Sequence, residues 1–412
     1  MMRYELKKIF LKPVNKIVFL ILFIVTITAG LLTIRDVRYL KENGEHISGT
    51  AAARELKKAK NSWRGELTED LLKQVIKENE KMRKGIKPQE KYENESDYWN
   101  AQDAAFQKTQ GIMDIKLMIS RAFSDPDNYD YYKADNVKAG EVGAFYERRV
   151  SNLKKWLDTT EEHYSFAQKK FLIGQYEKLK TPFFYEYADG WKALLDSQYL
   201  PTLMTIIVVI IGFFVAGIFS DEFQYKADSI FFSSKLGRGR AVGAKLGAGF
   251  VTVTAVYWGA VGLYTLFVLC TLGFGGAGCA IQTGNNWESF YNISYLQELL
   301  LTAIGGYIGS LFILILAMLV SAKSRSTVFA ITIPFALSCV PMFLGRVPLL
   351  TRIMTLFPDQ LLRVNKVLED FILYEIGGRV IGYIFVCMVL YLVLSVVLLP
   401  VVYGVYKRTQ IK

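Results

Sequence analysis

Six stretches of this 412-residue sequence contain no Asp, Glu, Lys or Arg, and they constrain the fold more than any other feature. A helix needs about 20 apolar residues to cross a hydrocarbon core of about 30 Å. The stretches, of about 17 to 27 residues each, cover 17–34, 200–219, 246–272, 299–322, 328–344 and 380–406. They predict an all-α polytopic membrane protein with six transmembrane helices, of which 328–344, with Pro334 and Pro341, is the shortest.

The first stretch follows Lys12 and Lys16 and contains Thr28, Ala29 and Gly30, so a signal peptide could produce a similar pattern. Its 18 residues exceed the about 7 to 15 of a signal-peptide core. We therefore predict an uncleaved membrane anchor.

Charged residues are divided unequally among the segments that join these stretches. Residues 36–199 hold 28 Lys/Arg and 28 Asp/Glu, so this block has no net charge. Segments 1–16, 220–245, 321–326 and 407–412 together hold 15 basic and 4 acidic residues, which equals the whole net charge of +11. Because basic loops stay on the cytoplasmic side, both termini are predicted in the cytoplasm and 36–199 outside the cell. The topology explains the basic composition, and no nucleic acid partner is expected.

The extracellular block is predicted to be helical. Ala105, Ile112, Ile115, Ile119 and Ala122 recur at three-, four- and seven-residue intervals, which places them on one helix face. All four cysteines of the chain, at 270, 279, 339 and 387, lie in or beside the apolar stretches. A disulfide scaffold is therefore excluded for this domain.

The sequence lacks the residues of several catalytic classes. It has only two histidines, His46 and His163, and no Gly-Lys dipeptide, which excludes HExxH zinc chemistry and a Walker A loop. The apolar stretches contain no Asp, Glu or His, the residues that form proton and cation relays in membranes. We predict that the chain is not an enzyme, holds no metal or cofactor, and takes any energy for transport from a partner.

The loop 220–245 has a pattern suited to such a partner, because an apolar cluster at 230–232 is flanked by polar and basic residues. Its order and spacing resemble the cytoplasmic coupling segment of ABC-2-type, type V exporter-like ABC transporter permeases with a large extracellular domain between the first two spans. The residues that carry the resemblance are Glu222, Ile230, Phe231, Phe232, Ser234, Arg238 and Lys245. Two positions depart from the family pattern, since Lys226 stands near the usual Gly and Lys235 near the usual Pro.

The resemblance extends to other segments and implies a domain organisation. Met2, Leu6 and Ile9 share an apolar face of a helix that resembles the family's N-terminal elbow helix. Two short amphipathic patterns around Pro358 resemble its half-membrane outer helices. The expected parts are 1–35 (elbow helix and first span), 36–199 (extracellular helical domain), 200–219 (second span), 220–245 (coupling loop), 246–345 (third to fifth spans), 346–379 (outer half-membrane helices) and 380–412 (sixth span and cytoplasmic tail).

The resemblance implies a function and a set of partners. The chain is expected to be the permease subunit of an ABC exporter in the bacterial plasma membrane, with ATP and Mg bound by a separate ABC ATPase subunit. The seven loop residues are its expected contacts, and a second copy or a paralogous permease completes the usual twelve spans. Membrane lipids are expected as further partners. The substrate is expected to be amphipathic or hydrophobic, such as an antimicrobial peptide, lipid or drug. The alternatives are a sodium or multidrug exporter permease, and a membrane sensor or scaffold that transports nothing.

Overall fold

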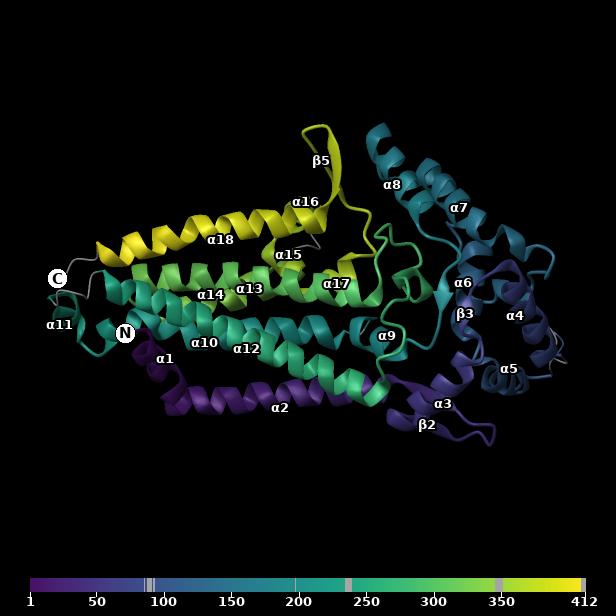
Figure 1. Cartoon of the computed structure of the whole chain (residues 1–412), viewed down its shortest axis with the longest axis horizontal. Coiled ribbons are helices and arrows are strands. Elements are labelled where there is room, and N and C mark those ends of the chain that lie inside the picture. Colours follow the sequence, from purple (N-terminus) through teal and green to yellow (C-terminus); the bar gives the residue numbers. More distant parts are fainter. Residues whose placement is uncertain are drawn as a thin grey trace.

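The computed structural model describes residues 1–84, 86, 91, 93–196, 198–233, 239–344 and 351–408, and helices predominate in these ranges. Five of the described helices are long and apolar enough to cross a membrane. They are α2 (Pro13–Asp36), α10 (Tyr199–Gln224), α12 (Arg240–Leu272), α13 (Tyr295–Ser324) and α18 (Tyr383–Lys407). The long helices form one bundle with their axes in broadly the same direction (Figure 1). The prediction of a mostly helical, multi-pass membrane protein is thereby confirmed.

The predicted span at 328–344 is divided into two shorter helices, α14 (Thr327–Cys339) and α15 (Pro341–Leu344). The 13 residues of α14 rise about 20 Å, which is less than the roughly 30 Å of a hydrocarbon core. Pro341 has no backbone N–H to continue the helical hydrogen bonds. A single long helix is therefore absent from the described part of this stretch.

The bundle has a buried centre and apolar flanks. The apolar part of α10 is 72% buried, whereas that of α18 is 22% buried. Apolar side chains such as Phe23 on α2 and Val396 on α18 face outward. A helix that exposes only apolar side chains is stable in lipid, because its backbone groups are satisfied internally.

Glycines on α13 allow a short irregular segment to approach this helix closely. The segment comprises η5 (Pro358–Leu362) and α17 (Val364–Val367) and follows α16 (Thr351–Met354). A Cβ atom added to Gly305 would lie 2.8 Å from Val364 Cγ2, and one on Gly309 would lie 3.0 Å from Leu361 Cβ. Larger residues at these two positions would push the segment away from the bundle.

The N-terminus and the end of α18 lie at one end of the bundle, opposite the large domain between α2 and α10 (Figure 1). We call these the terminal end and the outer end. Helix α1 (Met2–Leu11) lies at the terminal end and turns at Lys12 into α2. The short helix α11 (Asp228–Ser233) is found at the same end (Figure 1).

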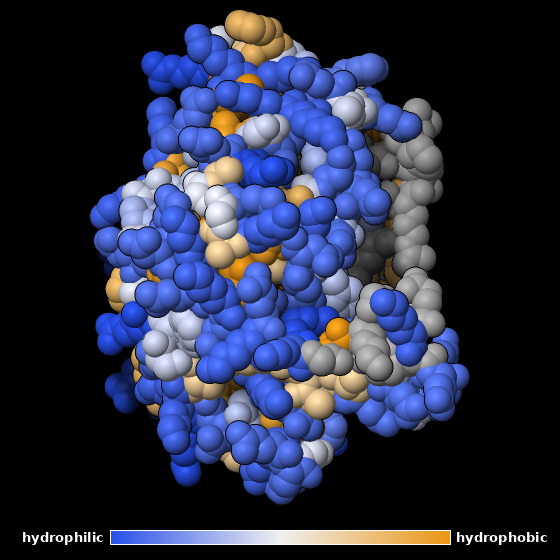
Figure 2. All heavy atoms as spheres, turned by 90° about the vertical axis from the view of Figure 1, so that its right-hand side faces the viewer, coloured by the Kyte–Doolittle hydropathy of each residue, from blue (hydrophilic) through white to orange (hydrophobic). Residues whose placement is uncertain are grey.

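The domain at the outer end is mostly helical, and its outward face is mostly hydrophilic (Figure 2). Two small antiparallel pairs join β1 to β2 and β3 to β4. Its elements are β1 (Arg38–Leu40), β2 (His46–Ser48), α3 (Thr50–Asn61), β3 (Gly65–Glu66), α4 (Glu69–Met82), α5 (Glu95–Thr109), α6 (Met113–Phe123), η2 (Lys133–Asp135), η3 (Val142–Ala144), α7 (Phe145–Thr159), α8 (Phe166–Lys178), β4 (Phe184–Tyr185) and α9 (Asp189–Asp196). Ile115 and Ile119, from the predicted apolar stripe, are fully buried in its core. The prediction that the whole stripe lies on one helix face is wrong, because α5 ends at Thr109 and α6 begins at Met113, so Ala105 belongs to a different helix.

A later loop completes this core. Trp287 follows η4 (Ile281–Thr283), between α12 and α13, and its ring lies 5.2 Å from that of Phe145. The Arg149 guanidinium donates to the carbonyl oxygens of Trp287 and Ser289 at 3.2 and 3.0 Å. The outer domain is therefore built from two separate parts of the chain. A second outer hairpin, β5 (Leu373–Ile376) with β6 (Arg379–Gly382), leads into α18.

Candidate functional site at the terminal end

The loop 220–245 begins with a tight turn at the end of α10. The Ala227 N–H donates to the Glu222 carbonyl at 2.8 Å and the Lys226 N–H to the Phe223 carbonyl at 3.2 Å. This pair of bonds forms a Schellman motif, and Lys226 occupies its left-handed position with φ of 55°. Glycine adopts this conformation without steric cost, which explains physically why a Gly suits the position better than Lys. The turn sets the direction in which α11 leaves the bundle.

Glu222 and Lys245 form a buried ion pair, although they were predicted to contact a partner protein. The Lys245 Nζ lies 2.7 Å from the Glu222 Oε1, and the two side chains are 1% and 7% exposed. The same Nζ donates to the Ile218 carbonyl at 2.6 Å. Both groups therefore face the protein interior, and any part they play in coupling is indirect.

Helix α1 surrounds this pair with further charges. Lys8 Nζ lies 3.3 Å from Glu222 Oε1 and 3.1 Å from Glu5 Oε1. Lys245 Nζ also lies 3.4 Å from Glu5 Oε2, and Lys12 pairs with Asp221. We call these six residues, Glu5, Lys8, Lys12, Asp221, Glu222 and Lys245, the terminal-end network. It joins α1 to the last turn of α10 and the first turns of α12.

Burial and ion pairing act in opposite directions on Lys8. Burial lowers the pKa of its ammonium group, but Glu5 and Glu222 together raise that pKa above its usual value. The Lys8 ammonium is therefore held in its charged form at neutral pH.

Helix α11 lies against the terminal-end network through one aromatic side chain. Phe231 is half-buried, with its ring centroid 5.4 Å from Lys245 Nζ and 6.0 Å from that of Tyr406 on α18. Tyr406 in turn contacts Phe219 of α10, with ring centroids 4.6 Å apart. Phe231 therefore connects α11 to three of the long helices.

Ile230 points the other way. This residue is 76% exposed, and α11 is a single short helix at the terminal end of the bundle. Phe232 lies in α11 but its side chain is outside what the structure describes, and Ser234 and Arg238 lie outside the described residues. Of the predicted contacts whose side chains are described, only Ile230 is freely available to a partner.

Sequence reasoning missed the contribution of α1. Lys8 and Lys12 were expected only on the polar face of the N-terminal helix, and Glu5 had no predicted role. In the structure Lys8 and Lys12 pair with the end of α10, and Glu5 faces Lys245 of α12. The one available signal was the pair of adjacent carboxylates, Asp221 and Glu222, at the end of an apolar stretch. Such carboxylates need nearby cations when buried.

The described part of this site consists of ion pairs and ring contacts between helices. Among the described residues there is no group of three or more His, Cys, Asp or Glu side chains that could hold a metal ion. Ion pairs and ring contacts join α1, α10, α12 and α18, and the Phe231 ring adds α11 to them.

Comparisons with protein families, with curated proteins and with solved structures give no match to this chain.

Proposed function

We propose that this chain is the permease subunit of an ATP-driven ABC exporter, and that a separate ATPase subunit binds α11. The observation that carries the proposal is that two adjacent side chains of α11 face different surroundings. Ile230 offers an exposed apolar contact, while the adjacent Phe231 lies on the terminal-end network. A partner that moves α11 would thereby act on α1, α10, α12 and α18 together.

Helix α10 is the element that would carry this movement through the membrane. Its terminal end holds Asp221 and Glu222, and its outer end follows α9 of the outer domain. Ser220 and Gln224 also bind Thr327 of α14 through side-chain hydrogen bonds of 2.7 and 2.9 Å. A displacement of this buried helix would shift the helices around it, because packed interiors transmit strain.

The orientation follows from the charge distribution. The segments at the terminal end carry all of the net charge of +11, which favours a cytoplasmic location for both termini and α11. ATP and Mg would be held by the partner, and two copies of the chain, or this chain and a related permease, would form the complete channel in the bacterial plasma membrane. The six apolar stretches of the sequence contain no acidic or histidine side chain, which suits an amphipathic or hydrophobic substrate.

The test is binding between this chain and a candidate ATPase subunit, chosen by the Walker A loop in a neighbouring reading frame. Ile230→Ala removes most of an exposed apolar side chain, and burying such a side chain contributes about 1.5–3 kcal/mol. Because Ile230 is 76% exposed, we expect a loss of about 1–2 kcal/mol, or roughly fivefold to thirtyfold in affinity. Binding is measured by titrating the purified ATPase subunit onto the permease in lipid nanodiscs.

Ile376→Ala is the matched control, since Ile376 is 52% exposed on the outer hairpin. It should leave ATPase binding unchanged. Both variants should keep the thermal stability of the permease, because surface substitutions usually change it by less than about 0.5 kcal/mol. Equal affinities for wild type and Ile230→Ala would contradict the role of α11, and failure of any neighbouring ATPase to bind would contradict the exporter.

A further inference from the structure

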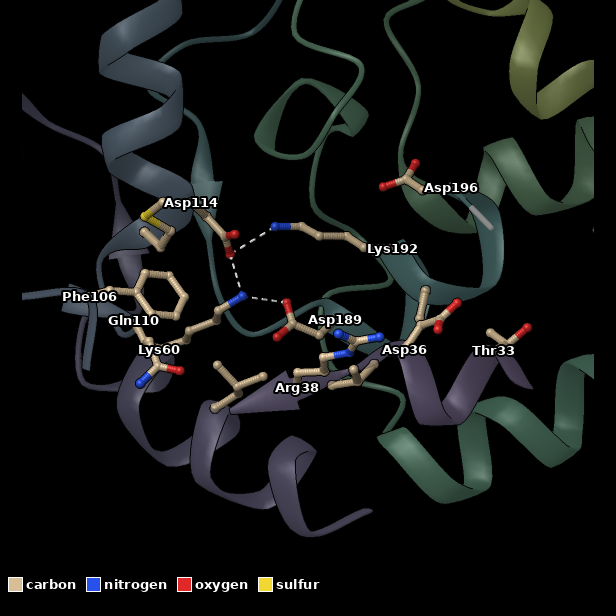
Figure 3. Close-up of a pocket in the computed structure, with 14 residues that line it drawn as sticks. Thr33, Asp36, Arg38, Lys60, Phe106, Gln110, Asp114, Asp189, Lys192 and Asp196 are labelled. Carbon is tan, nitrogen blue, oxygen red and sulfur yellow. Dashed lines mark hydrogen bonds and ion pairs between the residues drawn. The ribbon is translucent and has the colours of Figure 1, made fainter. Parts of the chain in front are cut away.

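A cavity of about 430 Å³ lies where the outer domain meets the bundle (Figure 3). Its lining comes from the end of α2, from β1, α3, α5 and α6, and from α9, so segments distant in sequence surround one space. The volume falls within the range of ordinary small-ligand sites. The cavity is separated from the terminal-end network by the length of the bundle.

Four buried charges form one wall of the cavity and neutralise one another. Lys60 lies 2.9 Å from Asp114 and 2.6 Å from Asp189, and Lys192 lies 2.8 Å from Asp114 (Figure 3). Burial by itself raises the pKa of Asp114, but Lys192 and Lys60 lower it far below the usual range. The two ammonium groups and two carboxylates of this wall balance in number.

The other three charged residues of the lining leave an excess of one carboxylate. Asp36 and Arg38 are exposed at the edge of the cavity, and neither forms an ion pair with any residue that the structure describes. Asp196 forms no ion pair with the described residues either, and its carboxylate accepts one hydrogen bond of 2.6 Å from Asn285. Four carboxylates and three cationic groups thus line the cavity.

Asp196 is the carboxylate most affected by its surroundings. Burial raises its pKa to about 6, and Glu369 acts in the same direction. Lys192, Lys366 and the hydrogen bond from Asn285 oppose this effect. A ligand cation beside Asp196 would supply the charge that the described residues do not fully provide.

Apart from Thr33 and Gln110, the uncharged part of the lining is apolar. Phe106 is 41% exposed and its ring faces the hollow opposite Asp36 (Figure 3), and Val37, Leu56, Met113 and Ala193 complete the apolar surface. An exposed ring beside unpaired carboxylates suits a ligand that combines an apolar group with a cation.

We propose that this cavity binds a cationic amphipathic ligand, as presented by a short peptide of alternating apolar and basic residues. The inference rests on the proposed function, for which it names the substrate class. Asp36 and Asp196 take the cationic groups, and the apolar groups contact Phe106. The buried ion pairs alone would serve to hold the domain in place, but such a role leaves the cavity and the unpaired carboxylates unexplained.

The position of the site also links it to the membrane helices. Asp189, Lys192, Ala193 and Asp196 all lie on α9, which directly precedes α10. An occupant therefore contacts the segment next to the most buried span, whose far end holds Glu222. Ligand binding would thus act on the outer end of α10, and movement of α11 would act on its terminal end.

The test uses the full chain in phosphatidylcholine nanodiscs without any ATPase subunit. The probe is a dansyl-labelled peptide of alternating Leu and Lys, with empty nanodiscs as the background. Replacing both Asp36 and Asp196 by Asn should weaken probe binding by about tenfold or more, since hydrogen bonds to charged groups are among the stronger ones. Ala193→Phe, which places a ring in the cavity, should abolish binding.

Asp158→Asn is the control, because Asp158 is an exposed aspartate on α7 that does not line the cavity. It should leave the affinity unchanged, and a peptide with Glu in place of Lys should not bind. Equal affinity of wild type and the double Asn variant would overturn the proposal. So would displacement of the probe by phosphatidylethanolamine in the nanodisc, which would assign the cavity to a lipid head group. Because no ATPase is present, this result is independent of the α11 binding experiment.

Discussion

Removal of one partner from the buried Glu222–Lys245 ion pair is expected to destabilise the bundle, and removal of both partners is expected to restore much of the loss. An isolated break of a buried pair typically costs about 3–5 kcal/mol, because an uncompensated charge remains inside the protein. Here each partner keeps a second contact. Glu222 still faces Lys8 at 3.3 Å, and Lys245 still faces Glu5 at 3.4 Å. We therefore expect about 2 kcal/mol for Glu222→Gln and for Lys245→Met alone.

The double variant leaves no unpaired charge at this place. Lys8 and Glu5 still pair at 3.1 Å, and methionine fills much of the volume of the lysine stem. If the two losses were independent, they would add to about 4 kcal/mol, whereas we expect the double variant to lose about 1–2 kcal/mol. The free energy of unfolding is measured for all four proteins by detergent titration in mixed micelles at neutral pH.

The exposed pair Lys154–Glu177 provides the matched control. Its atoms lie 3.4 Å apart and its side chains are 51% and 55% exposed. Lys154→Met and Glu177→Gln should each change stability by less than about 1 kcal/mol, with little coupling between them. Strictly additive losses for Glu222 and Lys245 would refute the inference that their charges compensate one another inside the bundle.

Three further predictions follow from single positions. Lys226→Gly should raise the unfolding free energy by about 0.5–1 kcal/mol, because the left-handed backbone no longer carries a Cβ, and Lys226→Ala should bring no gain. In a chain whose native cysteines are replaced by alanine, an impermeant thiol reagent should label Asn94→Cys in intact cells and leave Ser233→Cys unlabelled; the opposite pattern would invert the orientation. Binding of the Leu-Lys probe should weaken from pH 7 to pH 5, because the Asp196 carboxylate, with a pKa of about 6, becomes neutral and no longer attracts a cation. Asp196→Asn should remove most of that dependence, and an unchanged dependence would exclude Asp196 as the titrating group.

The bundle and its flanks could be predicted from the sequence because hydropathy and charge are local properties. Whether a stretch without charged residues is long enough to cross a membrane depends on that stretch alone and not on the rest of the chain. The ends of the helices needed more information. The last span was predicted from residue 380, but residues 379–382 pair with 373–376 in a hairpin, and α18 begins at Tyr383.

The contacts that define the two sites were decided by tertiary structure. Lys8, which contacts Glu222, lies 214 residues before it in the sequence. No local pattern indicates which basic residue at the terminal end approaches Glu222. The same holds for Phe231 and Ile230, which are adjacent and equally apolar in the sequence. Only the packing of α18 and α12 turns Phe231 inward and leaves Ile230 exposed.

The outer domain shows the same limit on a larger scale. The burial of Ile115 and Ile119 was predictable because a buried helix face repeats every three to four residues, but the break between α5 and α6 within the same stripe was not. Trp287 carries no such signal, since it lies in the irregular connection 273–294 between two membrane helices, yet its ring completes the core beside Phe145. Helix periodicity determines which residues face inward, but the identity of the partners depends on where distant segments meet, and only the folded chain determines that.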